Sequence, residues 1–231
     1  MTVSLPAAYA EPVRIERWGE ERQLLAAAAI EPGAVLVAEY PIAFVEVQPH
    51  EEDDGALLLL ESILATQDRE AHDRAADLKL GVWTLSRRET ERLAHYAEVY
   101  RRNPKKLTQL YHRVAANNIR YAQGGVIGYG LWPIVSRSNH SCDPNARLGA
   151  SEGQPLLELL IATRPIAPGT AICWNYLGDD SFLALDWCAR NAQLLKDFRF
   201  LCRCSRCEAE RPPEIAALPK AQIAAWFQRI G

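Results

Sequence analysis

Hydrophobic and polar positions follow different patterns along the chain. Residues 12–47 are rich in strand-forming valines, and Glu31-Pro32-Gly33 is typical of a turn between strands. Residues 56–80 and 86–118 instead carry apolar residues at helical spacing. Glycines, prolines and short apolar runs return from residue 124 onward. Together these patterns predict a helical insert between two β regions.

The ends of the predicted helices carry local signals. Ser86 and Glu89 have the S-x-x-E spacing of a capping box, which predicts that a helix begins there. Asn103-Pro104 predicts the end of that helix, because proline cannot continue it. A further helix is predicted over residues 107–117.

The last part of the chain mixes both kinds of element. Strands are predicted at 156–162 and 170–174, with a turn at Pro168-Gly169 between them. Residues 181–197 have the pattern of a helix. The tail predicts a short docked helix with an apolar face of Ile223, Trp226, Phe227 and Ile230. Strands, then helices, then strands again favour an α+β fold over a doubly wound sheet.

Composition narrows the class of protein. The chain has 231 residues, of which 48% are hydrophobic and 24% are charged, which is typical of a globular protein and not of a disordered one. Apolar runs such as 24–30 are far shorter than the roughly 20 residues that a bilayer requires. The net charge of -3 gives no general reason to bind nucleic acid or anionic membranes. No signal peptide is expected, so the predicted location is the cytoplasm or nucleus.

The cysteines give the first chemical signal. Cys202, Cys204 and Cys207 form C-x-C-x2-C, a spacing that lets three thiolates converge on one metal ion such as zinc. A tetrahedral structural site needs a fourth ligand from elsewhere in the chain. By residue type, the candidates are Cys142, Cys173, Cys188 and His140. The alternative is three ordinary free thiols, although structural cysteines seldom cluster this closely.

A second signal lies in the polar segment Arg137-Ser138-Asn139-His140-Ser141-Cys142-Asp143-Pro144-Asn145, which stands between apolar strands. Taken alone, this segment is also compatible with a surface loop that contains an Asx turn at Asp143-Pro144. Its neighbours along the chain make it more specific. The chain resembles the SET-domain protein methyltransferases, and especially their SET-and-MYND branch. The resemblance rests on motifs in the family's order: Gly128-Tyr129-Gly130-Leu131, Asn139 to Asn145, Pro168-Gly169-Thr170 followed by Tyr176, and Phe198-Arg199-Phe200 before the cysteine cluster.

The resemblance implies a knotted SET β-fold of the α+β class, with a helical insert and a zinc-binding post-SET segment. The expected layout is the N-terminal part of the SET domain over 12–55, the helical insert over 56–118, the C-terminal part of the SET domain over 119–182, the post-SET segment over 183–210 and a C-terminal helix over 211–231.

The resemblance also implies site residues. One structural zinc would be held by Cys142 together with the cluster Cys202, Cys204 and Cys207. Tyr176 is similar to the family's active-site tyrosine. S-adenosylmethionine would be held by Gly19, Asn117, Asn139, His140, Tyr176 and Phe200, with Asn118 as a close rival of Asn117.

The chain departs from the family's pattern in several places. The usual Gly-x-Gly near the N-terminus is reduced to Trp18-Gly19-Glu20, and Phe198 stands where the branch usually has a second active-site tyrosine. Residues 56–118 contain no cysteine, so no MYND finger is expected there. The chain ends at Gly231, so the branch's long helical C-terminal domain is expected to be missing.

The expected function is S-adenosylmethionine-dependent methyl transfer to a lysine of a protein substrate, without a nucleic-acid or membrane partner. Trp132, Trp174 and Phe182 are possible walls of a lysine channel, and burial in the core is their ordinary alternative. The alternative function is a catalytically inactive SET-like module that binds proteins. Phe198 and the reduced glycine motif favour that alternative. The residues that favour the enzyme are Asn139, His140, Phe200 and Tyr176.

Overall fold

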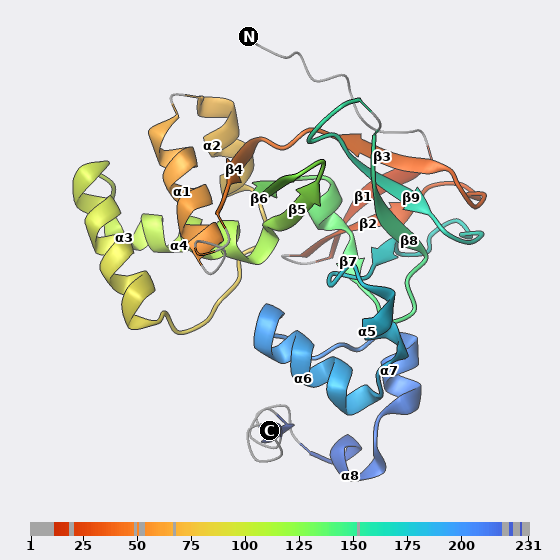
Figure 1. Cartoon of the computed structure of the whole chain (residues 1–231). Helices are drawn as coiled ribbons and strands as arrows, with labels where there is room; N and C mark the ends of the chain where they lie inside the picture. The colour runs from red at the N-terminus through yellow and green to blue at the C-terminus, as the bar shows by residue number, and fades with distance from the viewer. Residues whose placement is uncertain are drawn as a thin grey trace.

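The computed structural model describes residues 12–18, 21–48, 50, 54–66, 68–151, 153–218, 222, 223 and 227. Gly19, one of the predicted cofactor-binding residues, lies outside the described residues. Within them, the chain has the predicted α+β fold, with small sheets beside two groups of helices (Figure 1). No helix in this part of the chain is long and apolar enough to cross a membrane.

The strands form small sheets. Strands β1 and β2 pair in an antiparallel hairpin, and β7 and β10 pair in parallel. The two three-stranded sheets have the orders β3-β9-β8 and β4-β6-β5 and are antiparallel throughout. The strands are β1 Val13–Trp18, β2 Glu21–Ala26, β3 Val35–Glu39, β4 Ala43–Glu46, β5 Ile119–Gln123, β6 Val126–Leu131, β7 Asn139–His140, β8 Ala146–Ala150, β9 Glu158–Ala162 and β10 Cys173–Trp174.

The helical insert packs around its own apolar core. Its helices are α1 Gly55–Ala65, α2 Arg69–Ala76, α3 Arg87–Val99 and α4 Pro104–Asn117. The capping box predicted at Ser86 and Glu89 is confirmed, because each side chain binds the backbone N–H of the other residue. Asn103 caps the following helix by accepting from Lys106 N. Leu59, Ile63, Tyr96 and Val114 are among the residues of this core.

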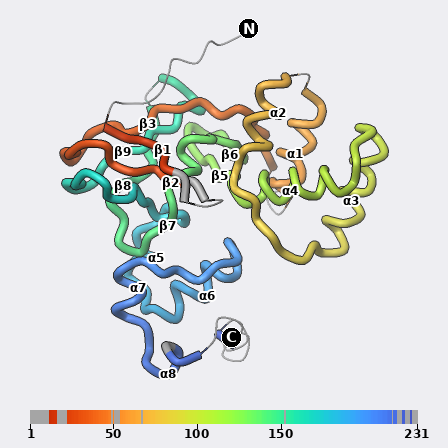
Figure 2. Tube along the Cα trace, turned by 180° about the vertical axis from the view of Figure 1, so that it is seen from behind, coloured from red at the N-terminus to blue at the C-terminus, as the bar shows by residue number. Residues whose placement is uncertain are grey.

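The C-terminal helices form a third packed region beneath the sheets (Figures 1 and 2). They are α5 Asp180–Ala184, α6 Trp187–Phe198, α7 Ser205–Glu210 and α8 Pro213–Ala216. The single helix predicted over 181–197 is wrong, because Asp186 caps a new helix by accepting from Ala189 N. In the tail, Ile223 and Phe227 are buried as predicted, whereas Trp226 and Ile230 lie outside the described residues.

Two predicted strands are shorter than expected. Strand β9 begins at Glu158 and not at residue 156, because Leu156 has φ +66 and therefore cannot continue a strand. Strand β10 covers Cys173–Trp174 alone. The turn predicted at Pro168-Gly169 is present, and Gly169 supplies its positive φ of 79.

A buried carboxylate ties the insert to the sheets. Glu39, at the end of β3, accepts hydrogen bonds from the backbone N–H groups of Ile134 and Val135. It also pairs with Arg74 of α2 at 3.3 Å. These partners occupy both carboxylate oxygens, so Glu39 serves as a structural link between sheet, insert and the short 3₁₀ helix η2, Val135–Arg137.

Candidate functional site

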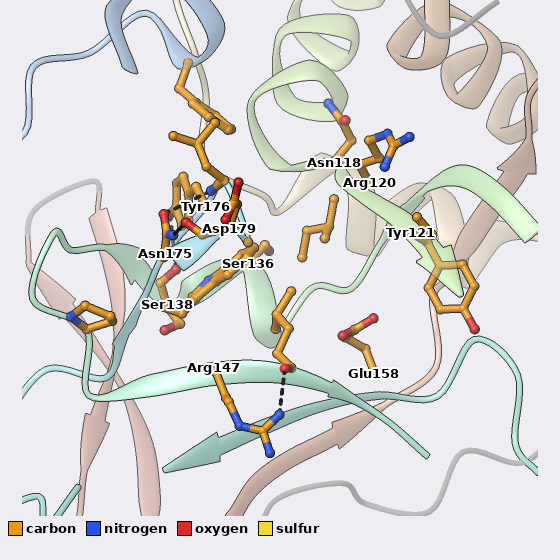
Figure 3. A pocket seen from close by; sticks show the side chains of 18 of the residues that line it. Asn118, Arg120, Tyr121, Ser136, Ser138, Arg147, Glu158, Asn175, Tyr176 and Asp179 are labelled. Atoms are coloured by element: carbon orange, nitrogen blue, oxygen red, sulfur yellow. Dashed lines mark hydrogen bonds between the residues drawn. The ribbon is translucent and has the colours of Figure 1, made fainter. Parts of the chain in front are cut away.

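A large groove opens beside β10. It has a volume of about 1120 Å³ and lies between β5, the β8–β9 sheet, the segment that follows β10, and the end of α6. Figure 3 shows Tyr176, Asn175 and Ser138 on one side of this groove and Tyr121 and Glu158 on the other. A groove of this size exceeds the 300–1,000 Å³ typical of small-ligand pockets, so it can take part of a larger ligand.

Tyr176 is fixed at one end of the groove. Its hydroxyl donates to Ser138 O at 3.1 Å, and its backbone N–H donates to His140 Nδ1 at 3.3 Å. The ring packs against Trp174 and Phe198, with centroid distances of 5.0 and 5.4 Å. Burial raises the pKa of the Tyr176 hydroxyl, so it stays protonated near neutral pH. The hydroxyl oxygen can therefore orient a neighbouring group without ionising.

His140 connects Tyr176 to the cysteines. Burial lowers the pKa of His140 to about 4, so its imidazole is neutral at pH 7. Because Nδ1 accepts from Tyr176 N, the ring proton is assigned to Nε2, which lies 3.3 Å from Cys142 Sγ. The ring of Phe200 lies 5.9 Å from that of His140. The His140 side chain is thus engaged within the protein at both nitrogens.

Four cysteines converge below His140. The sulfur atoms of Cys142, Cys202, Cys204 and Cys207 all lie within 4.8 Å of one another. A regular tetrahedron with Zn–S bonds of about 2.3 Å has edges of about 3.8 Å, so this spacing suits one ion. Hydrogen bonds among the four thiols lower the pKa of Cys204 and that of Cys207, the latter to about 7, and raise the pKa of Cys142 and of Cys202. The structure thus brings together the cysteine set that the resemblance implies.

Buried polar residues of α6 surround this cysteine centre. Arg190, which is completely buried, pairs with Glu210 at 2.5 Å and lies 3.9 Å from Cys207 Sγ. Asn191 donates to Cys207 Sγ at 3.7 Å and accepts from Cys202 N at 2.8 Å. A guanidinium and an amide N–H next to the sulfurs favour the thiolate form, which is the form that binds metal.

The asparagines predicted to hold a cofactor differ in whether their side chains already have hydrogen-bond partners in the protein. Asn117 donates to Lys79 O and to Arg113 O, both at 2.7 Å, so its amide nitrogen holds α4 against the preceding loop. Asn118 likewise donates to the end of its own helix, at Ala115 O. Asn139 is half-buried, and no hydrogen bond within the described part of the chain involves its side chain. The Asn139 amide is therefore available to a ligand.

The aromatic residues predicted as possible channel walls lie in different parts of the structure. Trp132 is completely buried and stacks on Tyr121 in the core of the sheets. Phe182 belongs to the apolar core around the cysteines. Trp174 lines the groove, and so does Phe198, which lies beside Tyr176. The aromatic wall next to Tyr176 is thus built from Trp174 and Phe198.

Sequence reasoning missed Glu158 in the groove and Arg190 beside the cysteines. Glu158 is 3% exposed and lies in the groove wall, within an otherwise apolar strand. A lone acid in the run Leu156-Leu157-Glu158-Leu159-Leu160 was a usable signal, because acids are almost never fully buried without a partner. Arg190 carried no comparable signal, since arginine is common on exposed helix faces.

Known proteins are similar in sequence to the part of the chain that forms this site. A family model described as SET domain matches residues 21–177, which is more than half of the chain. The chain is 28% identical to the SET domain and MYND-type zinc finger protein 6 of Schizosaccharomyces pombe over 141 residues, or 60% of this chain and 27% of that protein.

Two human proteins are similar over shorter stretches. Protein-lysine N-trimethyltransferase SMYD5 is 36% identical over 90 residues, which cover 36% of this chain and 19% of that protein. Histone-lysine N-methyltransferase SMYD3 is 34% identical over 106 residues, which cover 45% of this chain and 23% of that protein. Across the three relatives, the chain matches at most 27% of their length.

Proposed function

Because the chain belongs to the SET domain family, we propose that it transfers a methyl group from S-adenosylmethionine to a lysine side chain of a protein. The observation that carries the proposal is the position of Tyr176. Its protonated hydroxyl is anchored on Ser138 O, at the end of a groove large enough for a peptide segment. The similarity to SMYD5 and SMYD3, which are named as lysine methyltransferases, supports the reaction class.

The residues around Tyr176 fit the cofactor. Asn139 offers a half-buried amide without an internal partner, and the Phe200 ring lies 6.2 Å from that of Tyr176. We propose that Asn139 binds polar groups of S-adenosylmethionine and that Phe200 packs against its adenine. When bound, the cofactor supplies a methyl group on a positively charged sulfonium. The engaged side chain of His140 then acts by holding Tyr176 and not by direct binding.

The groove must also favour the neutral form of the substrate lysine. The lysine pKa is about 10.4, so holding the amine neutral at pH 7 costs about 4.6 kcal/mol. The aromatic wall of Trp174, Tyr176 and Phe198 excludes water and thereby lowers the pKa of a lysine placed beside it. The Tyr176 oxygen can accept a hydrogen bond from the amine and align it for attack.

We further propose one structural zinc ion at the four cysteines. The sulfur spacing suits a tetrahedral ion, and Arg190 and Asn191 stabilise the thiolates. Clustered reduced thiols of this kind are typical of reducing compartments, which supports the expected location in the cytoplasm or nucleus.

The first test is calorimetric titration of the purified, zinc-loaded protein with S-adenosylmethionine, followed by a search for methylated lysines in a cell lysate. We expect micromolar binding that weakens at least about tenfold in Asn139→Ala, because a hydrogen bond to a charged ligand is worth about 1.5–3 kcal/mol. Ser151→Ala is the control, since Ser151 bonds to nearby Gln154, away from Tyr176.

Two outcomes would contradict this proposal. Binding that is equal in Asn139→Ala and in the wild type would remove Asn139 from the cofactor site. A folded, zinc-loaded protein that neither binds S-adenosylmethionine nor methylates lysate proteins would favour the alternative, an inactive module that binds proteins. The specific observation behind that alternative is Phe198, which presents a ring without a hydroxyl 5.4 Å from Tyr176.

A further inference from the structure

The groove extends well beyond Tyr176, and its far wall holds a buried acid. Glu158 begins β9, and its side chain lies across the groove from Tyr176 (Figure 3). Glu158, Leu160 and Ala162 share the buried face of the strand. The alternation of the strand predicts an apolar residue at this position, but the residue there is an acid. The position lies in the wall of an open groove.

The Glu158 carboxylate has no partner in the described part of the chain, where no hydrogen bond or ion pair reaches it. The residue as a whole is nevertheless only 3% exposed. Burial alone raises its pKa to about 7. Buried charges are normally paired, because an unpaired one loses its hydration without compensation. The geometry therefore leaves a carboxylate that a cation entering the groove would satisfy.

The hydrogen bonds of the polar groups near Glu158 go to other residues in the described part of the chain. Tyr121 Oη accepts from Leu156 N, and Trp132 Nε1 donates to Leu156 O, both at 3.2 Å. Glu39 lies directly opposite Glu158 on β3, and its carboxylate is taken up by two backbone N–H groups and Arg74. None of these three groups neutralises Glu158.

The basic residue nearest along the sheet points the other way. Arg147 pairs with Ile161 in the β8–β9 register, whereas Ala150 pairs with Glu158. Because side chains alternate between the two faces of a strand, Arg147 and Glu158 lie on opposite faces of the sheet. Figure 3 shows the Arg147 side chain turned away from that of Glu158, with its bond to Leu148 O.

The backbone before Glu158 is held rigidly. Leu156 has a positive φ of 66, which is unfavourable for a residue with a branched side chain. Tyr121 and Trp132 hold it there through its N–H and C=O groups. Since Glu158 follows two residues later, these bonds fix the backbone at the start of β9, which carries Glu158 in the groove wall.

We propose that Glu158 is a subsite for a second cationic side chain, lysine or arginine, on the same protein substrate that presents its target lysine at Tyr176. The inference rests on the proposed function. It adds a specificity rule, namely that the preferred substrates carry a basic residue at a fixed spacing from the target lysine. An arginine would fit best, because its guanidinium can bind a carboxylate through two parallel hydrogen bonds.

The test uses synthetic peptides and the full, zinc-loaded chain. Each fluorescent peptide has one central lysine in a glycine–serine background and one arginine, moved stepwise along either side of that lysine. Matched peptides carry citrulline, which has nearly the shape of arginine without its charge. Fluorescence anisotropy gives Kd for each pair with the wild type and with Glu158→Gln. Asp197→Asn, which changes an exposed carboxylate at the rim of the same groove, is the control.

We expect the arginine peptide to bind at least about fivefold more tightly than its citrulline partner at one spacing, because it pairs with a buried carboxylate. Glu158→Gln should reduce that ratio to about one, whereas Asp197→Asn should change it by less than about twofold, as exposed ion pairs contribute little. A ratio that Glu158→Gln leaves unchanged, or no preference for arginine at any spacing, would overturn the subsite.

Methyl transfer to the same peptides separates the two proposals. Selective binding that depends on Glu158, without methylation of any peptide, would contradict the proposed function and retain the subsite. Methylation without any preference for arginine would retain the function and reject the subsite. Circular dichroism of Glu158→Gln checks its fold, which we expect to be intact because no buried group loses a partner.

Discussion

The cysteine centre and the groove both contain buried polar side chains, but they use them differently. Around the cysteines, buried Arg190 contacts Glu210 and Cys207, and Asn191 bonds to Cys202 and Cys207. In the groove, the carboxylate of Glu158 has no such contact within the described residues. The first arrangement can stabilise the fold by itself, whereas the second becomes favourable when a ligand arrives.

The same contrast occurs within one sheet. Glu39 and Glu158 are cross-strand neighbours on β3 and β9, and both are 3% exposed. Glu39 binds Ile134 N, Val135 N and Arg74, which join three parts of the fold. Glu158 binds none of them. Two acids with equal burial can therefore have opposite roles, and their partners distinguish a structural residue from a candidate binding residue.

The largest effect should come from the cysteine centre. We expect about one zinc ion per chain, and its removal by a chelator should lower the melting temperature by at least about 10 °C, because structural zinc contributes about 10 kcal/mol or more. Elemental analysis and thermal unfolding measure this. Cys207→Ser should act like the chelator, whereas Cys188→Ser changes a half-buried thiol outside the cluster and serves as its control. A metal-free protein with an unchanged melting temperature would refute the zinc assignment.

The next effect compares the two acids directly. Glu39→Ala leaves the N–H groups of Ile134 and Val135 without acceptors, and each such loss costs about 1–3 kcal/mol. Glu158→Ala removes the same atoms from the same sheet face, but it leaves no hydrogen-bond donor of the described residues without its acceptor. We therefore expect Glu39→Ala to lower the free energy of unfolding by about 3 kcal/mol more than Glu158→Ala, as measured by urea unfolding. Equal losses would mean that partners do not distinguish the two sites.

A third effect depends on pH. Burial raises the pKa of Glu158 from 4.5 to about 7, so between these values the folded state binds more protons than the unfolded state. The contribution of Glu158 to stability therefore falls as pH rises from 4.5 to 7 and is constant above. Burial also raises the pKa of Glu39, the cross-strand neighbour of Glu158, to about 7, so both proteins retain a pH dependence from Glu39.

Glu158→Gln should remove this decrease in stability between pH 4.5 and pH 7. Relative to the wild type, the variant should gain about 3 kcal/mol in free energy of unfolding between pH 4.5 and pH 8. Urea unfolding at a series of pH values measures the difference. Glu46→Gln, at an exposed position on β4, should stay within about 0.5 kcal/mol of the wild type at every pH. A constant difference between Glu158→Gln and wild type would show that Glu158 ionises as it does in the unfolded chain.

The smallest effect on free energy concerns catalysis. Tyr176→Phe should reduce turnover at least about tenfold, which corresponds to about 1.4 kcal/mol, because the hydroxyl that orients the amine is lost. Binding of S-adenosylmethionine should stay within about twofold, and stability should fall by about 1 kcal/mol or less, for one hydrogen bond to Ser138 O. Tyr100→Phe makes the same chemical change in the helical insert and should not alter turnover. Unchanged turnover in Tyr176→Phe would remove Tyr176 from the mechanism.

Local signals predicted part of the fold well. The capping box of Ser86 and Glu89 depends on residues three apart, so it can be found in the sequence, and so could the cap at Asp186 that divides the last predicted helix. The late start of β9 depends instead on Leu156, whose positive φ is stabilised by Tyr121 of β5 and by Trp132, which follows β6. A window of neighbouring residues contains no information about such contacts.

In the candidate site, too, the sequence predicted local features but not contacts between distant segments. Three of the four clustered cysteines stand within six residues and predict a metal site by spacing alone, whereas residue type left the fourth ligand open. Cys142 joins them because the fold brings a segment some sixty residues earlier against α7, a contact implied by the family resemblance alone. For Asn117, the bonds to Lys79 O and Arg113 O depend on loop packing that the sequence pattern does not reveal.

His140 contacts both the cysteine centre and Tyr176. One ring nitrogen accepts from the backbone of Tyr176 and the other lies against Cys142 Sγ, so a single rigid ring spans the distance between them. Coupling of this kind is reciprocal: if metal binding shifts the affinity of the Tyr176 end for a ligand, that ligand shifts the affinity for metal by the same factor. If such coupling exists, the equilibrium affinity of the four cysteines for zinc, measured by competition with a chelator, would report groove occupancy without any methyl transfer.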